Sequence, residues 1–167
     1  MQPILETERL RLRPWQDADH SALAAFYASE ASRFVGGPLS LAESWRRLAL
    51  FVGHWTLRGF GNWVVEEKTS HRAAGYAGLW QPYGWPEPEI MWVLYDGFRG
   101  WGYATEAARR AGDYAFLELG WSTAVSYIHE ENAPSQRVAE RIGARFDATL
   151  KSPGGNQVWR HLLSSRH

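Results

Sequence analysis

A glycine-rich stretch at residues 97–108 holds the residue types best suited to binding a charged group. Gly100 and Gly102 permit a sharp backbone bend, and the chain from Ala104 onward is predicted to form a helix. The first N–H groups of a helix lack internal partners and lie at the positive end of its dipole. With Arg99 beside them, these donors predict a site for phosphate or pyrophosphate.

Two common nucleotide-binding motifs do not fit this stretch. A Walker loop ends in Gly-Lys-Ser/Thr, which does not follow Gly102 here. A dinucleotide fingerprint needs a third glycine, where this chain has Thr105, and an acidic residue about twenty positions later, where it has Trp-Ser-Thr at residues 121–123. A nucleotide-binding module is therefore disfavoured, and an ordinary strand-to-helix turn remains the alternative to an anion site.

The elements on either side must hold this loop in place. Residues 89–95 are rich in β-forming side chains and predict a strand. After the loop, alanines recur at helical spacing and predict a helix whose small apolar face packs closely on a sheet. These alanines are Ala104, Ala107, Ala108, Ala111 and Ala115.

Three blocks of the chain carry a resemblance to a known family. The pattern Arg99-x-x-Gly102-x-Ala104 resembles the pyrophosphate-binding pattern of the GNAT superfamily of acyl-CoA-dependent N-acetyltransferases. The Asn-x-x-Ser segment that begins at Asn132 is similar to a later block of the RimJ/RimL-like branch, which acetylates ribosomal-protein N-termini. The opening at residues 7–13 resembles the first strand of that branch, so the likeness covers essentially the whole chain.

The resemblance implies one N-acetyltransferase domain over residues 1–167, with an α/β fold. Its central mixed sheet is expected to be mostly antiparallel, splayed at the cofactor site and flanked by helices. The patterns of the chain agree with that order of elements. They predict strands at 9–13, 62–66, 73–80, 89–95, 124–129, 146–150 and 158–163, and helices at 17–29, from 41 to near 59, from 104 onward and at 134–143. The last two strands are predicted to join through a turn at residues 152–155.

Cap residues define the first two predicted helices. Asp17 is expected to cap the first, and Ser40 with Glu43 forms a capping box for the second, which ends near Gly59. The apolar residues of the second helix are predicted to share one buried face. They are Leu41, Trp45, Leu48, Ala49, Val52 and Trp55.

The resemblance also implies a chemistry: acetyl-CoA as co-substrate, an amine acceptor, and direct transfer in a ternary complex without a metal. Glu89 is the candidate base, with Glu87, Tyr127 and His129 in reserve, and Ser135 is the candidate donor to the sulfur. Asn132 is expected to hold the pantetheine arm. The cofactor-binding residues implied are Val93, Leu94, Arg99, Gly100, Trp101, Gly102, Tyr103, Ala104, Thr105, Asn132 and Ser135.

Structural roles remain open for these candidates. Glu89 fits equally well as a solvated residue at a strand end, and Asn132 with Ser135 is also good helix-capping chemistry. The chain departs from its relatives at Ala139, where many carry a tyrosine acid, and at Met91, where the branch frequently has glycine. The alternative to an enzyme is a sensor or scaffold that binds acyl-CoA without turnover.

Composition limits the other possibilities. Eighteen basic and eighteen acidic residues give a formal charge of zero, so neither a nucleic-acid nor a membrane partner is expected. The chain has no cysteine and its start has no apolar signal core, which favours a cytoplasmic protein. The oligomeric state stays open between a monomer and a homodimer, and the abundance of aromatic residues would allow the latter. The acceptor, a protein N-terminus or a small amine, is expected beside aromatic residues that also suit a core: Phe34, Trp45, Trp80, Tyr83 and Trp85.

Overall fold

The computed structural model describes residues 1–152 and 154–162. Pro153 of the predicted turn and Leu163 at the end of the last predicted strand lie outside these residues. The strands are β1 (Leu5–Glu6), β2 (Leu10–Arg13), β3 (Asn62–Glu67), β4 (Arg72–Trp80), β5 (Glu89–Leu94), β6 (Thr123–Ile128), β7 (Arg145–Lys151) and β8 (Gln157–Leu162). The helical elements are η1 (Asp17–Asp19), α1 (His20–Tyr27), η2 (Glu30–Val35), α2 (Leu41–Arg58), α3 (Tyr103–Asp113), η3 (Tyr114–Glu118) and α4 (Ala133–Arg141).

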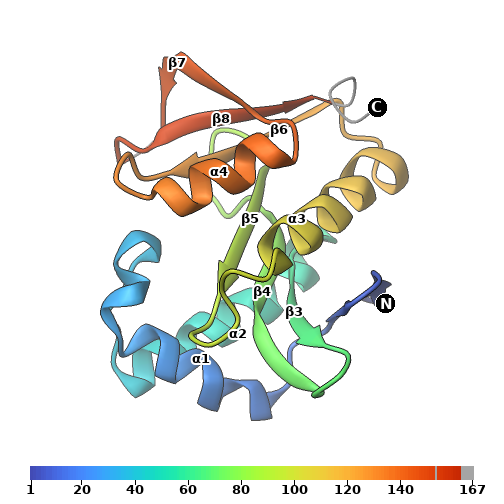
Figure 1. Cartoon of the computed structure of the whole chain (residues 1–167), viewed down its shortest axis with the longest axis vertical. Helices are drawn as coiled ribbons and strands as arrows, with labels where there is room; N and C mark the ends of the chain where they lie inside the picture. Colours follow the sequence, from blue (N-terminus) through green and yellow to red (C-terminus); the bar gives the residue numbers. More distant parts are fainter. Residues whose placement is uncertain (153, 163–167) are drawn as a thin grey trace.

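The strands form one mixed sheet in the order β1-β2-β3-β4-β5-β6-β8-β7. Neighbouring strands are antiparallel except β5 and β6, which are parallel. Within the described residues that parallel register joins a single pair, Glu89 and Val125, and the Val125 N–H donates to Pro88 O at 2.9 Å. The predicted mostly antiparallel, splayed sheet is therefore confirmed, with the opening between β5 and β6 (Figure 1).

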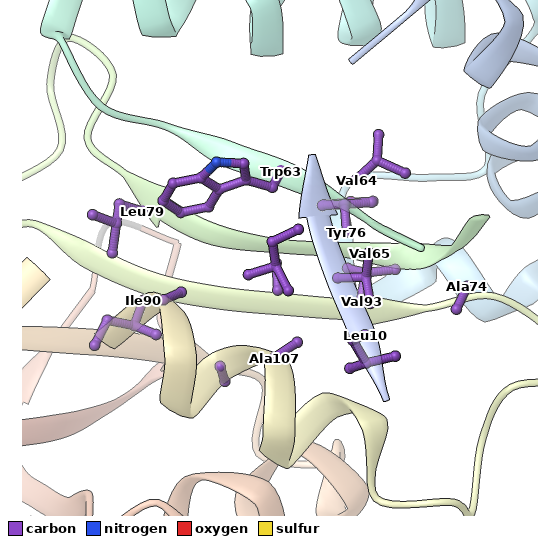
Figure 2. Close-up of a cluster of buried hydrophobic side chains, with 14 of the residues drawn as sticks. Leu10, Trp63, Val64, Val65, Ala74, Tyr76, Leu79, Ile90, Val93 and Ala107 are labelled. Carbon is purple, nitrogen blue, oxygen red and sulfur yellow. The ribbon is translucent and has the colours of Figure 1, made fainter. Parts of the chain in front are cut away.

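Helices cover both faces of the sheet. The α1–α2 pair packs on one face, while α3 lies on the other with α4 beside it (Figure 1). Phe51 of α2 stacks on Trp15 with ring centroids 5.2 Å apart and lies 5.0 Å from the ring of Tyr76 in β4. On the opposite face, Ala107 of α3 lies next to β5, the strand that carries Ile90 and Val93 (Figure 2).

The alanine stripe explains how α3 approaches the sheet so closely. Ala107, Ala108, Ala111 and Ala115 are all fully buried, as their spacing predicted. Small side chains let the helix backbone come near the strands, which fixes the start of the helix and the loop that precedes it. Ala104, one turn earlier, is only partly buried because it lies at the loop end of the stripe.

The second helix begins and ends where its caps predicted. Ser40 Oγ accepts from the Glu43 N–H at 3.2 Å, and the Glu43 carboxylate accepts from the Ser40 N–H at 2.8 Å. Gly59 follows the helix in the left-handed conformation, with φ of 76°. The capping box and the glycine stop are both confirmed.

The buried face predicted for α2 is wrong in part. Leu48 is buried and Trp55 half-buried, but Trp45 is 50% exposed, and Leu41, Ala49 and Val52 also face solvent. The helix instead buries Ser44 and His54 beside Leu48 and Phe51.

Both polar side chains find hydrogen bonds inside, which removes the cost of burying them. Ser44 Oγ lies 2.9 Å from His20 Nε2, the His54 Nδ1 atom lies 2.7 Å from Phe60 O, and His54 Nε2 accepts from the Gln81 N–H at 3.0 Å. Hydrogen-bonding partners far away in sequence, rather than side-chain polarity, set the orientation of this helix.

The first predicted helix is divided. A 3₁₀ turn, η1, precedes α1, and a second one, η2, follows it. Asp19, not Asp17, accepts from the Gln16 N–H at 2.8 Å, because Arg13 holds its carboxylate with two contacts of 2.9 Å. The prediction of Asp17 as the cap is wrong, because Gln16 is the N-cap residue of η1 and Asp19 that of α1.

Candidate active site

A cavity of about 560 Å³ opens where β5 and β6 separate. The loop before α3 lies beside the last residue of β5, since Arg99 Nη2 donates to Leu94 O at 3.5 Å, and Glu89 stands at the other end of that strand. The start of α4, η2 and β6 complete the lining. The opening in the sheet thus brings together segments that are far apart in the chain. Its lining includes these predicted site residues: Glu89, Val93, Leu94, Arg99, Gly100, Gly102, Ala104, Thr105, Asn132 and Ser135.

Two predicted cofactor residues turn their side chains elsewhere. Trp101 is 66% exposed on the outside of the loop. The Tyr103 hydroxyl donates to Glu67 Oε2 at 2.5 Å, and its ring lies 4.7 Å from the guanidinium carbon of Arg9. At both positions only backbone groups are left to serve a ligand in the cavity.

The loop before α3 has the geometry of an anion-binding turn. Gly97, Gly100 and Gly102 have φ of 86°, 84° and 82°, a left-handed conformation that favours glycine. Gly102 is the N-cap of α3, and the first helical hydrogen bond runs from the Glu106 N–H to Gly102 O at 3.1 Å. The three N–H groups before it, at residues 103–105, are therefore directed out of the helix start.

This loop can accommodate the pyrophosphate of a coenzyme A thioester. A Cβ built at Gly100 meets no atom within 4 Å, so the space beside the backbone is open. Thr105 Oγ1 is buried without a hydrogen-bond partner among the described residues, and Thr105 lines the cavity. Free N–H groups, an open approach and the Arg99 cation together suit a doubly charged phosphate group.

Glu89 is buried at the opposite end of the same cavity. Only 8% of the residue is exposed. Its Oε2 accepts from Trp85 Nε1 at 2.9 Å, and its Oε1 accepts from the Tyr127 N–H at 3.3 Å. Burial raises the pKa of Glu89 from the ordinary 4.5 to about 7, while the two hydrogen bonds lower it. Glu89 is thus not a solvated strand-end residue, and it can exchange a proton near neutral pH.

Asn132 and Ser135 begin α4 at the edge of the cavity. Asn132 is the N-cap residue, and its Oδ1 accepts from the Ser135 N–H at 3.3 Å. The capping role is confirmed for Asn132, while the hydroxyl of Ser135 stays available because only its backbone N–H takes part in the cap. Both residues line the cavity, so capping and ligand contact are compatible here.

The reserve candidates divide between two places. Tyr127 and His129 line the cavity, and the ring of His129 lies 5.0 Å from that of Phe34 across its mouth. Glu87 instead forms a two-point ion pair with Arg160, with contacts of 2.9 and 3.0 Å. Glu87 is held away from the cavity lining by this pair.

Among the aromatic residues expected near the acceptor, Phe34 is the one that lines the cavity. Trp45 faces solvent on α2, and Tyr83 is 98% exposed. Trp80 stacks on His54 with ring centroids 4.4 Å apart, inside the core. Trp85 does not line the cavity, but its indole donates to Glu89, which does. The other four are not part of the cavity lining.

Several lining residues were missed by the sequence analysis. Arg33 and Val35 come from η2, a 3₁₀ turn for which the chain offered no periodic signal. Ser126 lines the cavity where the sheet opens, and its Oγ donates to Ile90 O at 2.6 Å. That bond ties β6 to β5 next to their one register pair. Only a three-dimensional view could reveal these residues, because no motif marks them.

The two departures from the resembled family have different consequences. Ala139 is fully buried in a small core with Ile128 and Trp159 and does not line the cavity, so this position supplies no acid. Met91 does line the cavity, and its sulfur lies 3.6 Å from Asn62 Nδ2. Because Asn62 is fully buried and is not part of the lining, the end of the Met91 side chain packs into the core, while the residue also borders the cavity.

The described residues contain neither a cluster suited to a metal ion nor a helix suited to a membrane. No group of histidine, cysteine or acidic side chains there is arranged to hold a metal ion. Within the same residues, no helix combines the length and the apolar character needed to cross a membrane.

Comparisons with known proteins agree with this geometry. Over 87 residues, about half of each chain, the protein is 33% identical to the uncharacterized N-acetyltransferase YnaD of Bacillus subtilis. An acetyltransferase structure from Agrobacterium tumefaciens superposes with a TM-score of 0.90 and 38% identity, covering 96% of this chain and 95% of that one.

RimL, a ribosomal L7/L12 α-N-protein acetyltransferase solved with coenzyme A, shares the fold alone. Its TM-score is 0.77 at 14% identity, with 98% and 99% of the two chains covered. Residues 9–145 match the family described as the acetyltransferase (GNAT) domain. The chain thus belongs to the GNAT acetyltransferase family.

Proposed function

We propose that the protein is an N-acetyltransferase that moves the acetyl group of acetyl-CoA to a primary amine by direct transfer in a ternary complex. The observation that carries this proposal is the placement of Glu89, a buried carboxylate with a pKa of about 7, in the same cavity as the glycine loop before α3. One end offers anion-binding donors and the other a proton acceptor, which are the two functions that the reaction needs.

Each group of the cavity has a role in this proposal. Acetyl-CoA supplies the acetyl group as a thioester. The N–H groups of residues 103–105, with Arg99, bind the pyrophosphate. Val93 and Leu94 offer backbone groups to the pantetheine arm where the sheet opens. Asn132, at the start of α4, also lines the cavity and holds the same arm.

Glu89 accepts the proton that the acceptor must lose before its nitrogen can attack the carbonyl carbon. As the new C–N bond forms and the C–S bond breaks, the nitrogen loses a second proton. The Ser135 hydroxyl protonates the departing sulfur and regains a proton from that nitrogen, directly or through water. Coenzyme A leaves as the thiol, and the proton taken by Glu89 passes to solvent. No covalent intermediate on the protein is required.

The acceptor is either a protein N-terminus or a small-molecule amine. A RimJ/RimL-like role, with cytoplasmic protein N-termini as acceptors, is supported by the opening at residues 7–13 and by the Asn132-x-x-Ser135 block. Residues of η2 and β6 surround the acceptor end, with Phe34 and His129 at its mouth.

Calorimetric titration with acetyl-CoA, followed by thiol release against amines and peptide N-termini, tests the proposal. Binding with amine-dependent thiol release is the expected result. Binding without release from any acceptor would favour an acyl-CoA sensor, and a lack of binding would overturn the assignment of the cavity.

A further inference from the structure

Three side chains join the N-terminal segment to the first turn of α3. The carboxylate of Glu106 accepts at Oε1 from Thr7 Oγ1 at 2.6 Å and from the Arg9 N–H at 2.9 Å. Its Oε2 accepts from Arg9 Nε at 2.7 Å and lies 2.7 Å from Arg9 Nη2. Charge-assisted bonds of this kind are among the stronger ones in proteins. We call Thr7, Arg9 and Glu106 the N-terminal clasp.

The clasp also reaches the glycine loop itself. Arg9 Nη1 donates to Trp101 O at 2.8 Å, and the guanidinium lies over the ring of Tyr103. In a trans peptide the C=O and N–H point in opposite directions. Because Arg9 draws the Trp101 carbonyl to its own side, the N–H of Gly102 is turned away from Arg9.

The glycine loop separates an outer groove from the cavity, and Arg9 lies on the groove side of the loop. A groove of about 740 Å³ runs outside α3 and is lined by Arg9 and Glu106, whereas the cavity of about 560 Å³ lies inside. Gly100 and Gly102 line both. An N–H turned away from the groove side is thus turned toward the side where the pyrophosphate is proposed to bind.

Charge gives the clasp a second effect. Glu106 stands in the first turn of the helix whose N-terminus would receive the pyrophosphate, so its charge would repel that group if it were unpaired. Arg9 lies against the same carboxylate and offsets this repulsion. The loss of Arg9 should therefore be worse for anion binding than the loss of both partners.

We propose that the N-terminal clasp positions the glycine loop for the pyrophosphate of acetyl-CoA, with Thr7, Arg9 and Glu106 acting as positioning residues. This inference rests on the proposed function of the cavity. It assigns a role in cofactor affinity to a segment that lies outside the glycine motif and close to the start of the chain.

Two thioesters separate a role in positioning from a role in folding. Acetyl-CoA carries the pyrophosphate, whereas acetyl-pantetheine does not, so only the first should depend on the loop. For Arg9→Gln we expect KM for acetyl-CoA to rise about tenfold at unchanged kcat, the effect of losing roughly one strong hydrogen bond. KM for acetyl-pantetheine should stay within about twofold of the wild-type value, since none of its atoms reaches the loop.

Further variants sharpen this test. Arg9→Gln combined with Glu106→Gln should bind acetyl-CoA better than Arg9→Gln alone, because the unpaired carboxylate is gone. Thr7→Val keeps the size of the side chain and should raise KM for acetyl-CoA about threefold by removing the bond to the Glu106 carboxylate. It also removes the bond that the Thr7 hydroxyl accepts from the Leu10 N–H. The control is Arg11→Gln, which breaks a similar pair between Arg11 of β2 and Glu6 of β1 (2.8 Å) without reaching the loop, and which should change neither KM.

Each outcome decides the matter. An equal loss with both thioesters, or no change in either KM, overturns the clasp. If Arg9→Gln does not fold, as judged by circular dichroism, Thr7→Val decides alone. If wild-type protein binds no coenzyme A in calorimetry, the proposed function and the clasp fall together, whereas normal wild-type binding with unchanged variants removes only the clasp.

Discussion

The two ends of the cavity are built in different ways. The cofactor end consists mainly of backbone groups from one continuous segment, the loop and helix start at residues 97–105. The acceptor end consists of side chains from separate elements: Phe34 of η2, Glu89 of β5 and Tyr127 of β6. A backbone site needs glycines at fixed spacing and is visible in a sequence, whereas a side-chain site exists only after the elements have been assembled.

The charged side chains differ between the two ends. Arg99, Arg137 and Arg141 line the cavity near the loop and α4, and Arg33 of η2 adds a fourth cation to the lining. At the acceptor end a single carboxylate, Glu89, is buried among aromatic neighbours and held by two hydrogen bonds. We therefore expect changes at the two ends to separate cleanly, with turnover affected at one and cofactor affinity at the other.

The largest effect is expected for Glu89→Gln. Removal of a general base from an otherwise intact site should lower kcat about 100- to 1,000-fold. The dissociation constant of acetyl-CoA, measured by calorimetry, should not change. Glu118→Gln is a suitable control, because that exposed carboxylate lies far from the cavity lining, and it should keep wild-type turnover. Wild-type kcat in Glu89→Gln would remove Glu89 from the mechanism.

The pH dependence of the wild-type enzyme should report the same group. Because the base must be ionised and its pKa is about 7, kcat/KM at pH 5 should lie about 100-fold below its plateau above neutrality. The acid limb should be missing in Glu89→Gln. A wild-type profile that is flat between pH 5 and 8 would show that another group, or water, takes the proton.

The free energy of unfolding should fall as pH rises, whereas kcat/KM should rise. The native protein binds the Glu89 proton up to about pH 7, whereas the unfolded chain releases it near 4.5, so this group favours the native state at low pH. That contribution is lost as pH rises through 7, and it amounts to about 3 kcal/mol. Urea unfolding at pH 5 and 8 should show this difference between wild type and Glu89→Gln. Parallel unfolding curves for the two proteins would contradict it.

A smaller effect is expected at the cofactor end for Gly102→Ala. A side chain at φ of 82° adds about 1–2 kcal/mol of strain. If the loop relieves this strain by changing its backbone conformation, the dissociation constant of coenzyme A should rise about tenfold. Gly120→Ala provides a control of similar backbone conformation, since Gly120 has φ of 73°. A Cβ at Gly120 meets no atom within 4 Å, whereas a Cβ at Gly102 lies 3.4 Å from Arg9 Nη2. Both variants should lose stability in thermal unfolding, but only the first should lose affinity.

The smallest effect is expected for Ser135→Ala. Loss of one hydrogen bond to the leaving sulfur should lower kcat about five- to tenfold while the cap at Asn132 remains, since that cap uses the backbone N–H of Ser135. Steady-state kinetics at saturating acetyl-CoA measure this directly. An unchanged kcat would leave water as the proton donor.

Much of the fold could be predicted because its signals are local. The capping box at Ser40, the stop at Gly59 and the alanine stripe of α3 each depend on residues within a few positions of one another. The glycine loop falls in the same class, since Gly100 and Gly102 adopt the left-handed conformation that glycine favours.

The rest depends on contacts between distant residues. The orientation of α2 is set by bonds from Ser44 to His20 and from His54 to Gln81, which no periodicity encodes. The burial of Glu89 likewise depends on the Trp85 indole and the Tyr127 N–H. A residue at a strand end is solvated or buried according to what the following strands bring to it.

The opening between β5 and β6 divides the ladder of the sheet into two, joined at Glu89 and Val125 and by the Ser126 side chain. The middle of a sheet is normally its slowest-exchanging region, but here it contains two inner edges. Amide hydrogens on those edges should exchange quickly until a ligand fills the gap. In this protein, occupancy of the site would thus be recorded as hydrogen-exchange protection at the very centre of the fold.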